Sequence, residues 1–75
     1  MGFAPVASRT ALTETAKKHL PDAHFVEVYE VCDGLPWKLV VRVGAAHPYV
    51  QHFQEGDLYL VCKMAATHFQ IGAYP

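Results

Sequence analysis

The clearest alternation of apolar and polar positions lies at residues 25–43, which read FVEVYEVCDGLPWKLVVRV. Two runs rich in β-branched and aromatic residues flank the dipeptide Asp33-Gly34. This dipeptide suits a two-residue type I′ turn, because both central residues of that turn need a positive φ. The pattern therefore predicts a β-hairpin with strands at about residues 24–32 and 37–43.

The turn also fixes the register of the hairpin, which places Val28 opposite Leu39. Because side chains alternate between the two faces of a sheet, each face of the hairpin collects every second residue. The face assigned to the core carries Val26, Val28, Trp37, Leu39 and Val41, with Glu30 near the turn. The opposite face carries Phe25, Glu27, Tyr29, Val31, Lys38, Val40 and Arg42. On that face we expect Glu27 to pair with Lys38 or Arg42 across the strands.

A pattern of helical period precedes the hairpin, in the segment SRTALTETAKKHLPD at positions 8–22. Leu12, Ala16 and Leu20 recur there at the spacing of one helix face. A serine or threonine at position 8 or 10 can cap the start, and Pro21 ends the helix because the residue before a proline avoids the α region. The segment predicts one helix of about ten residues, which must dock its apolar stripe on the sheet because so short a helix is marginal alone.

The C-terminal half has a largely apolar pattern, which we interpret as further strands. Residues 49–53 favour a strand, with a short helix starting at Pro48 as the alternative. A turn at Glu55-Gly56 then leads to a strand over Asp57–Met64, and a turn at 65–67 leads to a last strand over His68–Tyr74. In the first of these strands Leu58, Leu60, Cys62 and Met64 alternate with Tyr59, Val61 and Lys63.

Together these elements predict one α+β domain spanning residues 1–75. One N-terminal helix packs on one face of a four- to five-stranded, mainly antiparallel sheet that runs as a meander. Residues 1–8 contain Gly2, Pro5 and several small side chains, and we expect an irregular arm there.

Composition narrows the class of protein. The chain has 75 residues, of which 52% are hydrophobic and 17% charged, and so apolar a chain is not intrinsically disordered. A domain of this size has little interior in which to bury apolar side chains, which favours a partner, most simply a second copy in a homodimer. A net charge of −1 argues against a general nucleic-acid binder, because phosphate contacts require a basic excess. No apolar run is long enough for a membrane helix and no signal-peptide layout is present, so we expect a cytoplasmic protein.

No arrangement of side chains predicts an enzyme, a metal site or a cofactor. The five histidines, His19, His24, His47, His52 and His68, lack the close ligand pairs of zinc sites. Cys62 is expected to point into the core, which makes a nucleophilic pair with His52 or His68 unfavourable. Without a secretory signal we expect Cys32 and Cys62 to be reduced, with a disulfide as the alternative if their strand ends adjoin.

The outward side of the sheet is the more informative surface. One helix covers only one face, and the other is expected to collect aromatic, aliphatic and basic side chains where a solvated face carries Thr, Ser, Lys and Glu. The predicted partner-binding residues are Phe25, Tyr29, Lys38, Val40, Arg42, Tyr59, Val61 and Lys63. His52, His68 and Tyr74 join them if the outer strands follow the same alternation. These features predict a small protein-interaction module, namely an inhibitor, modulator or adaptor that binds a protein partner or a second copy through this open face or through an edge strand. Its size also suits a phage protein.

The alternative function is a single-stranded nucleic-acid binder. In that case Tyr29 and Tyr59 would stack on bases beside Lys38, Arg42 and Lys63. The acidic balance of the chain and the interleaved carboxylate of Glu27 favour the protein partner.

We expect Val40→Glu or Tyr59→Glu to disrupt association and to leave the fold intact, because each adds a charge to the predicted binding face. Light scattering on the eluting protein measures the association. A monomer at high concentration, from which no partner co-purifies, would contradict this expectation.

Overall fold

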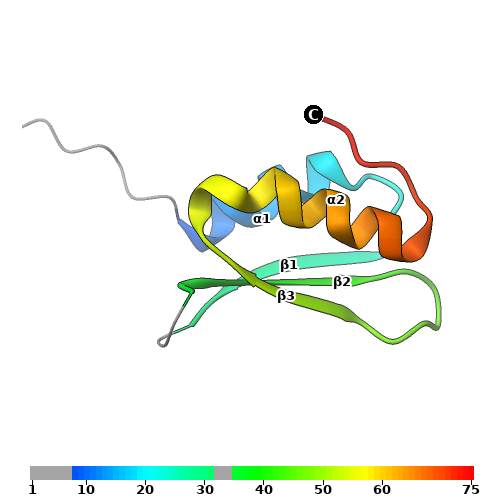
Figure 1. Ribbon diagram of the computed structural model, residues 1–75, viewed down its shortest axis with the longest axis horizontal. Coiled ribbons are helices and arrows are strands. Elements are labelled where there is room, and N and C mark those ends of the chain that lie inside the picture. Colours follow the sequence, from blue (N-terminus) through cyan, green and yellow to red (C-terminus); the bar gives the residue numbers. More distant parts are fainter. Residues whose placement is uncertain (1–7, 32–34) are drawn as a thin grey trace, which may run out of the picture.

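The computed structural model describes residues 8–31 and 35–75. Two helices lie on one face of a three-stranded antiparallel sheet, so the protein has two layers (Figure 1). In chain order the elements are α1 (Arg9–His19), β1 (Phe25–Glu30), β2 (Trp37–Arg42), β3 (Tyr49–Phe53), the short 3-10 helix η1 (Glu55–Asp57) and α2 (Leu58–Phe69).

The predicted N-terminal helix is confirmed as α1. Ser8 is its N-cap, and its side-chain oxygen accepts a hydrogen bond from the backbone N–H of Ala11 at 3.0 Å. The helix ends at His19, one residue before the Leu20-Pro21 pair. The predicted apolar stripe of Leu12, Ala16 and Leu20 is buried.

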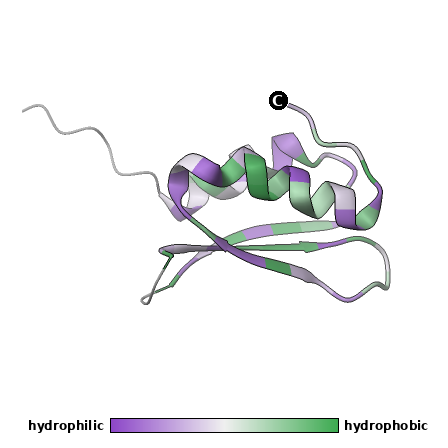
Figure 2. Cartoon of the chain, in the orientation of Figure 1, coloured by the Kyte–Doolittle hydropathy of each residue, from purple (hydrophilic) through white to green (hydrophobic). Residues whose placement is uncertain are grey.

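The predicted register of the hairpin is also confirmed, with Val28 opposite Leu39. The turn dipeptide and Cys32 lie outside the described residues, as does the predicted irregular arm except for Ser8. The third predicted strand, residues 49–53, is β3, and it pairs with β2 in a sheet of order β1-β2-β3. Apolar and polar residues alternate along the strands (Figure 2). The face beneath the helices buries all the predicted core positions, Val26, Val28, Trp37, Leu39 and Val41.

The strands predicted over Asp57–Met64 and His68–Tyr74 are wrong, and so is the turn between them. Residues 58–69 form the single helix α2, and the sheet has three strands instead of four or five in the described residues. Residues 71–75 follow α2 without regular structure. The buried residues of α2 recur at helical spacing and are Leu58, Val61, Cys62, Ala65 and Ala66. A segment this apolar satisfies a period of two and a helical period alike, which explains the error.

The end of α2 also lacks the usual sequence signal. Helices commonly end at a glycine in the left-handed conformation, whereas here Gln70 adopts it, with φ 58°. The backbone N–H of Ile71 donates to the carbonyl of Ala66 at 2.9 Å and closes the last turn. Since the nearest glycine is Gly72, the sequence placed no stop at residue 70.

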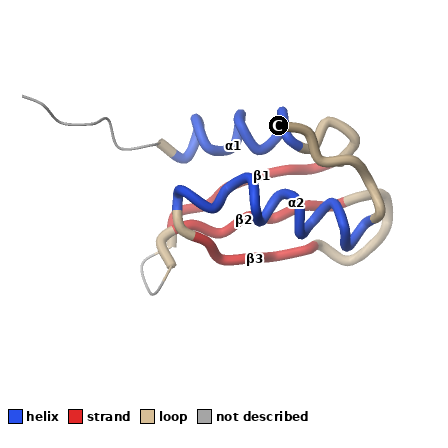
Figure 3. The backbone as a smooth tube through the Cα atoms, turned by 45° about the horizontal axis from the view of Figure 1, so that its top comes forward, coloured by secondary structure: helices blue, strands red, loops and turns tan. Residues whose placement is uncertain are grey.

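The helices divide the inner face of the sheet between them. Figure 3 shows α1 beside β1, and α2 across β2 and β3. The C-terminal segment returns to the end of α1, where the N–H of Tyr74 donates to the carbonyl of His19 at 2.8 Å. The Nδ1 atom of His19 lies 2.6 Å from the carbonyl oxygen of Tyr74. None of the helices in the described ranges is long and apolar enough to cross a membrane.

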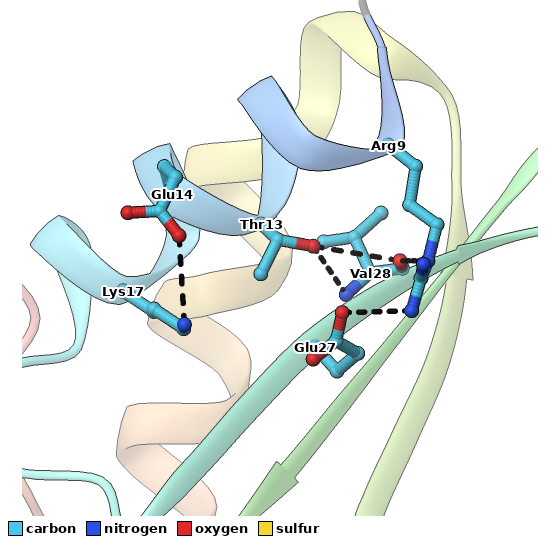
Figure 4. Close-up of polar contacts among 6 residues, drawn as sticks. All are labelled: Arg9, Thr13, Glu14, Lys17, Glu27 and Val28. Atoms are coloured by element: carbon cyan, nitrogen blue, oxygen red, sulfur yellow. Dashed lines mark hydrogen bonds and ion pairs between the residues drawn. The ribbon is translucent and has the colours of Figure 1, made fainter.

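A polar contact joins α1 to the middle of β1. The hydroxyl of Thr13 accepts a hydrogen bond from the N–H of Val28 at 3.0 Å and lies 3.5 Å from the carbonyl oxygen of the same residue (Figure 4). The Nε atom of Arg9 donates to that carbonyl at 2.9 Å. Because Thr13 is buried, its hydroxyl satisfies a backbone donor that water does not reach.

We predict that Thr13→Val destabilises the protein by about 1–3 kcal/mol, because it leaves the buried N–H of Val28 without an acceptor. The matched control is Thr13→Ser, which keeps the hydroxyl and loses only a methyl group. Urea unfolding measures both free energies. A Thr13→Val variant that is as stable as the wild type would contradict the role of this contact.

Candidate functional site

The sheet face opposite the helices, here called the outer face, carries no helix in the described residues. Its side chains form cross-strand rows through the register of the three strands. One row contains Tyr29, Lys38 and His52, the next contains Glu27, Val40 and Val50, and the last contains Phe25 and Arg42. The rows place Phe25, Tyr29, Lys38, Val40 and Arg42 on one surface, as predicted, together with His52.

The other three predicted partner-binding residues do not lie on the outer face, because they belong to α2. Val61 is buried in the core. The ring of Tyr59 lies 4.8 Å from the ring of His19 on α1, and the ammonium of Lys63 lies 5.5 Å from the centre of the Tyr59 ring. Their predicted place on the sheet was wrong for the same reason as the predicted strand over 57–64.

His68 and Tyr74 are likewise absent from the outer face. The ring of His68, in α2, lies 5.2 Å from the ring of Tyr49 and 4.8 Å from that of Phe69. Tyr74 contacts the end of α1 through its backbone. The outer face is therefore built by residues from β1, β2 and β3 together with one side chain from α1.

That side chain is Arg9, which the sequence did not point to. It lies at the start of α1 and extends past β1 to the outer face (Figure 4). Its guanidinium binds the carboxylate of Glu27 at 2.8 Å and lies 5.0 Å from the centre of the Tyr29 ring. Among the described residues Glu27 therefore has Arg9 as its ion-pair partner, in place of the predicted Lys38 or Arg42.

Two cations lie over the ring of Tyr29. The second is the ammonium of Lys38, 5.5 Å from the ring centre, from the neighbouring position on β2. Cation–π contacts of this kind are worth about 0.5–1 kcal/mol at exposed sites. They keep two positive charges close to an aromatic ring at one end of the outer face.

The charge of the outer face differs from that of the whole chain. Among the described residues, this face carries the three cations Arg9, Lys38 and Arg42 and the single carboxylate of Glu27, whereas the chain has a net charge of −1. A local positive charge of this kind attracts acidic groups over distances of about 10 Å at moderate salt. The outer face is therefore electrostatically suited to an acidic surface.

The centre of the outer face is apolar. Val40 and Val50 lie opposite each other on β2 and β3. Val50 is 48% exposed and Phe25 is 38% exposed, whereas Val40 is half-buried between the strands. The position of Val50 on this face follows from the alternation of β3, but it was overlooked because that segment was ambiguous between strand and helix.

The described residues enclose no pocket, and no three of their His, Cys, Asp or Glu side chains gather as metal ligands do. The thiol of Cys62 is free and fully buried. Burial raises the pKa of this thiol from its ordinary value of 9.0 to about 12. A thiol with so high a pKa is a poor nucleophile, so Cys62 acts as a core residue, as predicted, although it lies on a helix.

The chain was compared with models of protein families, with curated protein sequences and with solved structures, and none of them matches. Function is therefore inferred from the residues of the outer face and from the edges of the sheet.

We predict that Cys62 resists alkylation in the native protein and reacts once urea unfolds the chain, because only the thiolate is the nucleophile. Peptide mass spectrometry after iodoacetamide treatment measures this at Cys62 itself. Native protein that is alkylated as fast as unfolded protein would contradict the burial of this thiol.

The raised pKa of Cys62 also predicts how stability depends on pH. Above pH 9 the unfolded chain loses the thiol proton and the native protein keeps it. The contribution of the protonated Cys62 thiol to the free energy of unfolding is therefore fully present below pH 9. It is lost as the pH rises toward about 12. The measurement is the difference in unfolding free energy between the wild type and Cys62→Ala, which should shrink over this range. A difference that grows would contradict the prediction.

Proposed function

We propose that the protein is a small interaction module whose outer face binds a protein partner. The observation that carries the proposal is an apolar centre, formed by Val40 and Val50 with Phe25 at one end, on a sheet face that no described element covers. An interface of this composition buries aliphatic and aromatic side chains at its centre and places arginine at its rim, which is the usual arrangement in protein complexes.

The charges of the outer face indicate the chemistry of the partner. Arg42 is exposed at one end and Lys38 lies near the other, with the apolar pair of Val40 and Val50 between them. We infer a partner surface that is apolar at its centre and acidic at its margin, because that surface satisfies both the valines and the cations.

Such a protein would act by occupancy, as an inhibitor, modulator or adaptor, and not as an enzyme. The fully buried thiol of Cys62 is consistent with a role that needs no nucleophile. We place this activity in the cytoplasm, where reduced thiols persist.

A second candidate function is binding of single-stranded nucleic acid. It is favoured by the ring of Tyr29 with Arg9 and Lys38 beside it, since a stacking residue flanked by cations suits a base and its phosphate. We prefer the protein partner because the two cations already lie over the ring on which a base would stack. The apolar pair at the centre of the face also has no role in phosphate binding.

The proposal predicts that Val40→Glu abolishes capture of the partner, because it adds an unpaired carboxylate to the centre of the interface. The matched control is Thr67→Glu, which adds the same charge at an exposed position on α2. Each protein is immobilised and incubated with nuclease-treated host lysate, and captured proteins are quantified by mass spectrometry. A partner at the outer face is retained by the wild type and by Thr67→Glu, and is reduced at least about tenfold by Val40→Glu. Thermal unfolding of all three proteins verifies that the variants are folded.

The same proteins distinguish the two candidate functions. Binding to a labelled single-stranded oligonucleotide is titrated at low and at raised salt, since nucleic-acid affinity falls steeply with salt and apolar association does not. The protein-partner proposal predicts negligible oligonucleotide binding. Salt-sensitive binding that Tyr29→Ala removes would favour the second function. Equal capture of every protein by Val40→Glu and by the wild type would contradict the first.

A further inference from the structure

The two edges of the sheet differ in how their backbone groups are bonded. At the edge of β1, α1 bonds the middle residue Val28, since Thr13 accepts from its N–H and Arg9 donates to its carbonyl. No backbone group from residues 8–31 or 35–75 pairs with the outer edge of β3. Figure 3 shows the same asymmetry, with α1 beside β1 and no element beyond β3.

The alternation of the ladder identifies the backbone groups at the open edge. Val28 directs its N–H and carbonyl away from β2, so Val28 and Leu39 form a non-hydrogen-bonded pair. Leu39 therefore directs its N–H and carbonyl toward β3, where they bond to Gln51. The neighbours of Gln51, namely Val50 and His52, therefore direct their backbone groups outward. The carbonyl of His52 accepts from the Gln51 side-chain amide at 3.0 Å. The other three groups have no partner among the described residues.

The side chains of β3 do not protect this edge. Its sequence, YVQHF, has no lysine, arginine, carboxylate, proline or glycine. Natural edge strands generally carry such residues, or a bulge, to prevent pairing with another chain. Val50, at the open edge, is 48% exposed. The residues of β3 therefore do not prevent its open edge from pairing with a strand of another chain.

An apolar stripe on α2 lies on the same side of the molecule. Leu60, Met64 and His68 follow one another at intervals of four along the helix, so they share one face. His68 contacts Tyr49 of β3, which directs that face toward the β3 side. Leu60 is 54% exposed and Met64 is 43% exposed. The open strand and the exposed stripe thus form one continuous surface in two layers.

We propose that β3 pairs antiparallel with β3 of a second copy of this chain, about a two-fold axis at Gln51. Val50 of each copy then lies opposite His52 of the other, and the two residues exchange N–H···O bonds. The strand brings no charged pair together in this register, because β3 has no Lys, Arg, Asp or Glu. The product is a six-stranded sheet with four helices on one face.

The exposed stripe favours a second copy over another strand as the occupant. A two-fold axis perpendicular to the sheet places both α2 helices on the same face and antiparallel, so Leu60 and Met64 of one copy face those of the other. A lone extended peptide at the edge would bond the backbone of β3 and leave the stripe exposed. Only a partner that brings its own helix over its edge strand covers both layers. This inference does not rest on the proposed protein partner, because it uses the backbone groups of the β3 edge and the stripe on α2, although the side chain of Val50 also lies on the outer face.

A disulfide trap tests the register directly. In the proposed pairing the two Gln51 residues form the non-bonded pair on the axis, with Cα atoms about 4.5 Å apart, which a disulfide spans. Gln51→Cys, in a background where Cys32 is replaced by serine, should crosslink to a dimer in a glutathione redox buffer. Two thiols give up their protons and electrons, and one glutathione disulfide is reduced to two glutathione molecules. The matched control His52→Cys should stay uncrosslinked, because residue 52 lies opposite residue 50 of the other copy.

Sedimentation of the unmodified chain at rising concentration is the second measurement. In contrast to the expectation from the sequence that Val40→Glu disrupts self-association, the proposal predicts a monomer–dimer equilibrium in the wild type and in Val40→Glu. It predicts a monomer in Val50→Pro, which lacks the outward N–H. A wild type that stays monomeric at the highest concentration would overturn the proposal, as would equal crosslinking of Gln51→Cys and His52→Cys. A dimer lost in Val40→Glu and kept in Val50→Pro would also overturn it and would assign the self-contact to the outer face. If Val40→Glu loses capture of a lysate protein but still dimerises, the result supports the β3 dimer and assigns partner binding to the outer face.

Discussion

The architecture depends on the contact between the Thr13 hydroxyl and the backbone of Val28. This contact satisfies a buried N–H at the middle of β1 and fixes α1 along that edge of the sheet. It also places Arg9 where its guanidinium bonds the Val28 carbonyl and continues to Glu27 on the far side of the strand. One short helix thereby bonds the middle of that edge, contributes Leu12 and Ala16 to the core and supplies a cation to the opposite face.

With α1 at the edge of β1 and α2 across β2 and β3, both helices are used on the inner face. Two surfaces of the sheet stay uncovered by the described residues: the outer face and the edge of β3. They differ in chemistry, because the outer face combines valines with cations, whereas the edge offers backbone groups and the uncharged strand YVQHF. Such a difference suits two separate contacts, one to an acidic partner and one to a second copy.

Sequence patterns predicted α1 and the three strands of this arrangement, but not α2. The Val28–Leu39 register and the core side of β1 and β2 followed from alternation around a turn signal, and α1 followed from its cap and from Pro21. The outer-face residues on β1 and β2, such as Val40, were placed correctly because they follow from the same register. The helix α2 was missed because LYLVCKMAATHF is apolar at nearly every position and ends at Gln70 instead of a glycine, so neither its period nor its end was marked. Arg9 was missed because its contact with Glu27 joins residues 18 positions apart on different elements.

In this structure α1 bonds the β1 edge at Val28, whereas the β3 edge is left for association. Amide hydrogen exchange followed by NMR tests it most directly, residue by residue and at two protein concentrations. We expect the amide of Val28 to exchange slowly at both concentrations. The amides of Val50 and His52 should exchange rapidly in dilute protein and slowly in concentrated protein, as the edge becomes paired. Rapid exchange at Val28, or exchange at Val50 and His52 that does not change with concentration, would contradict it.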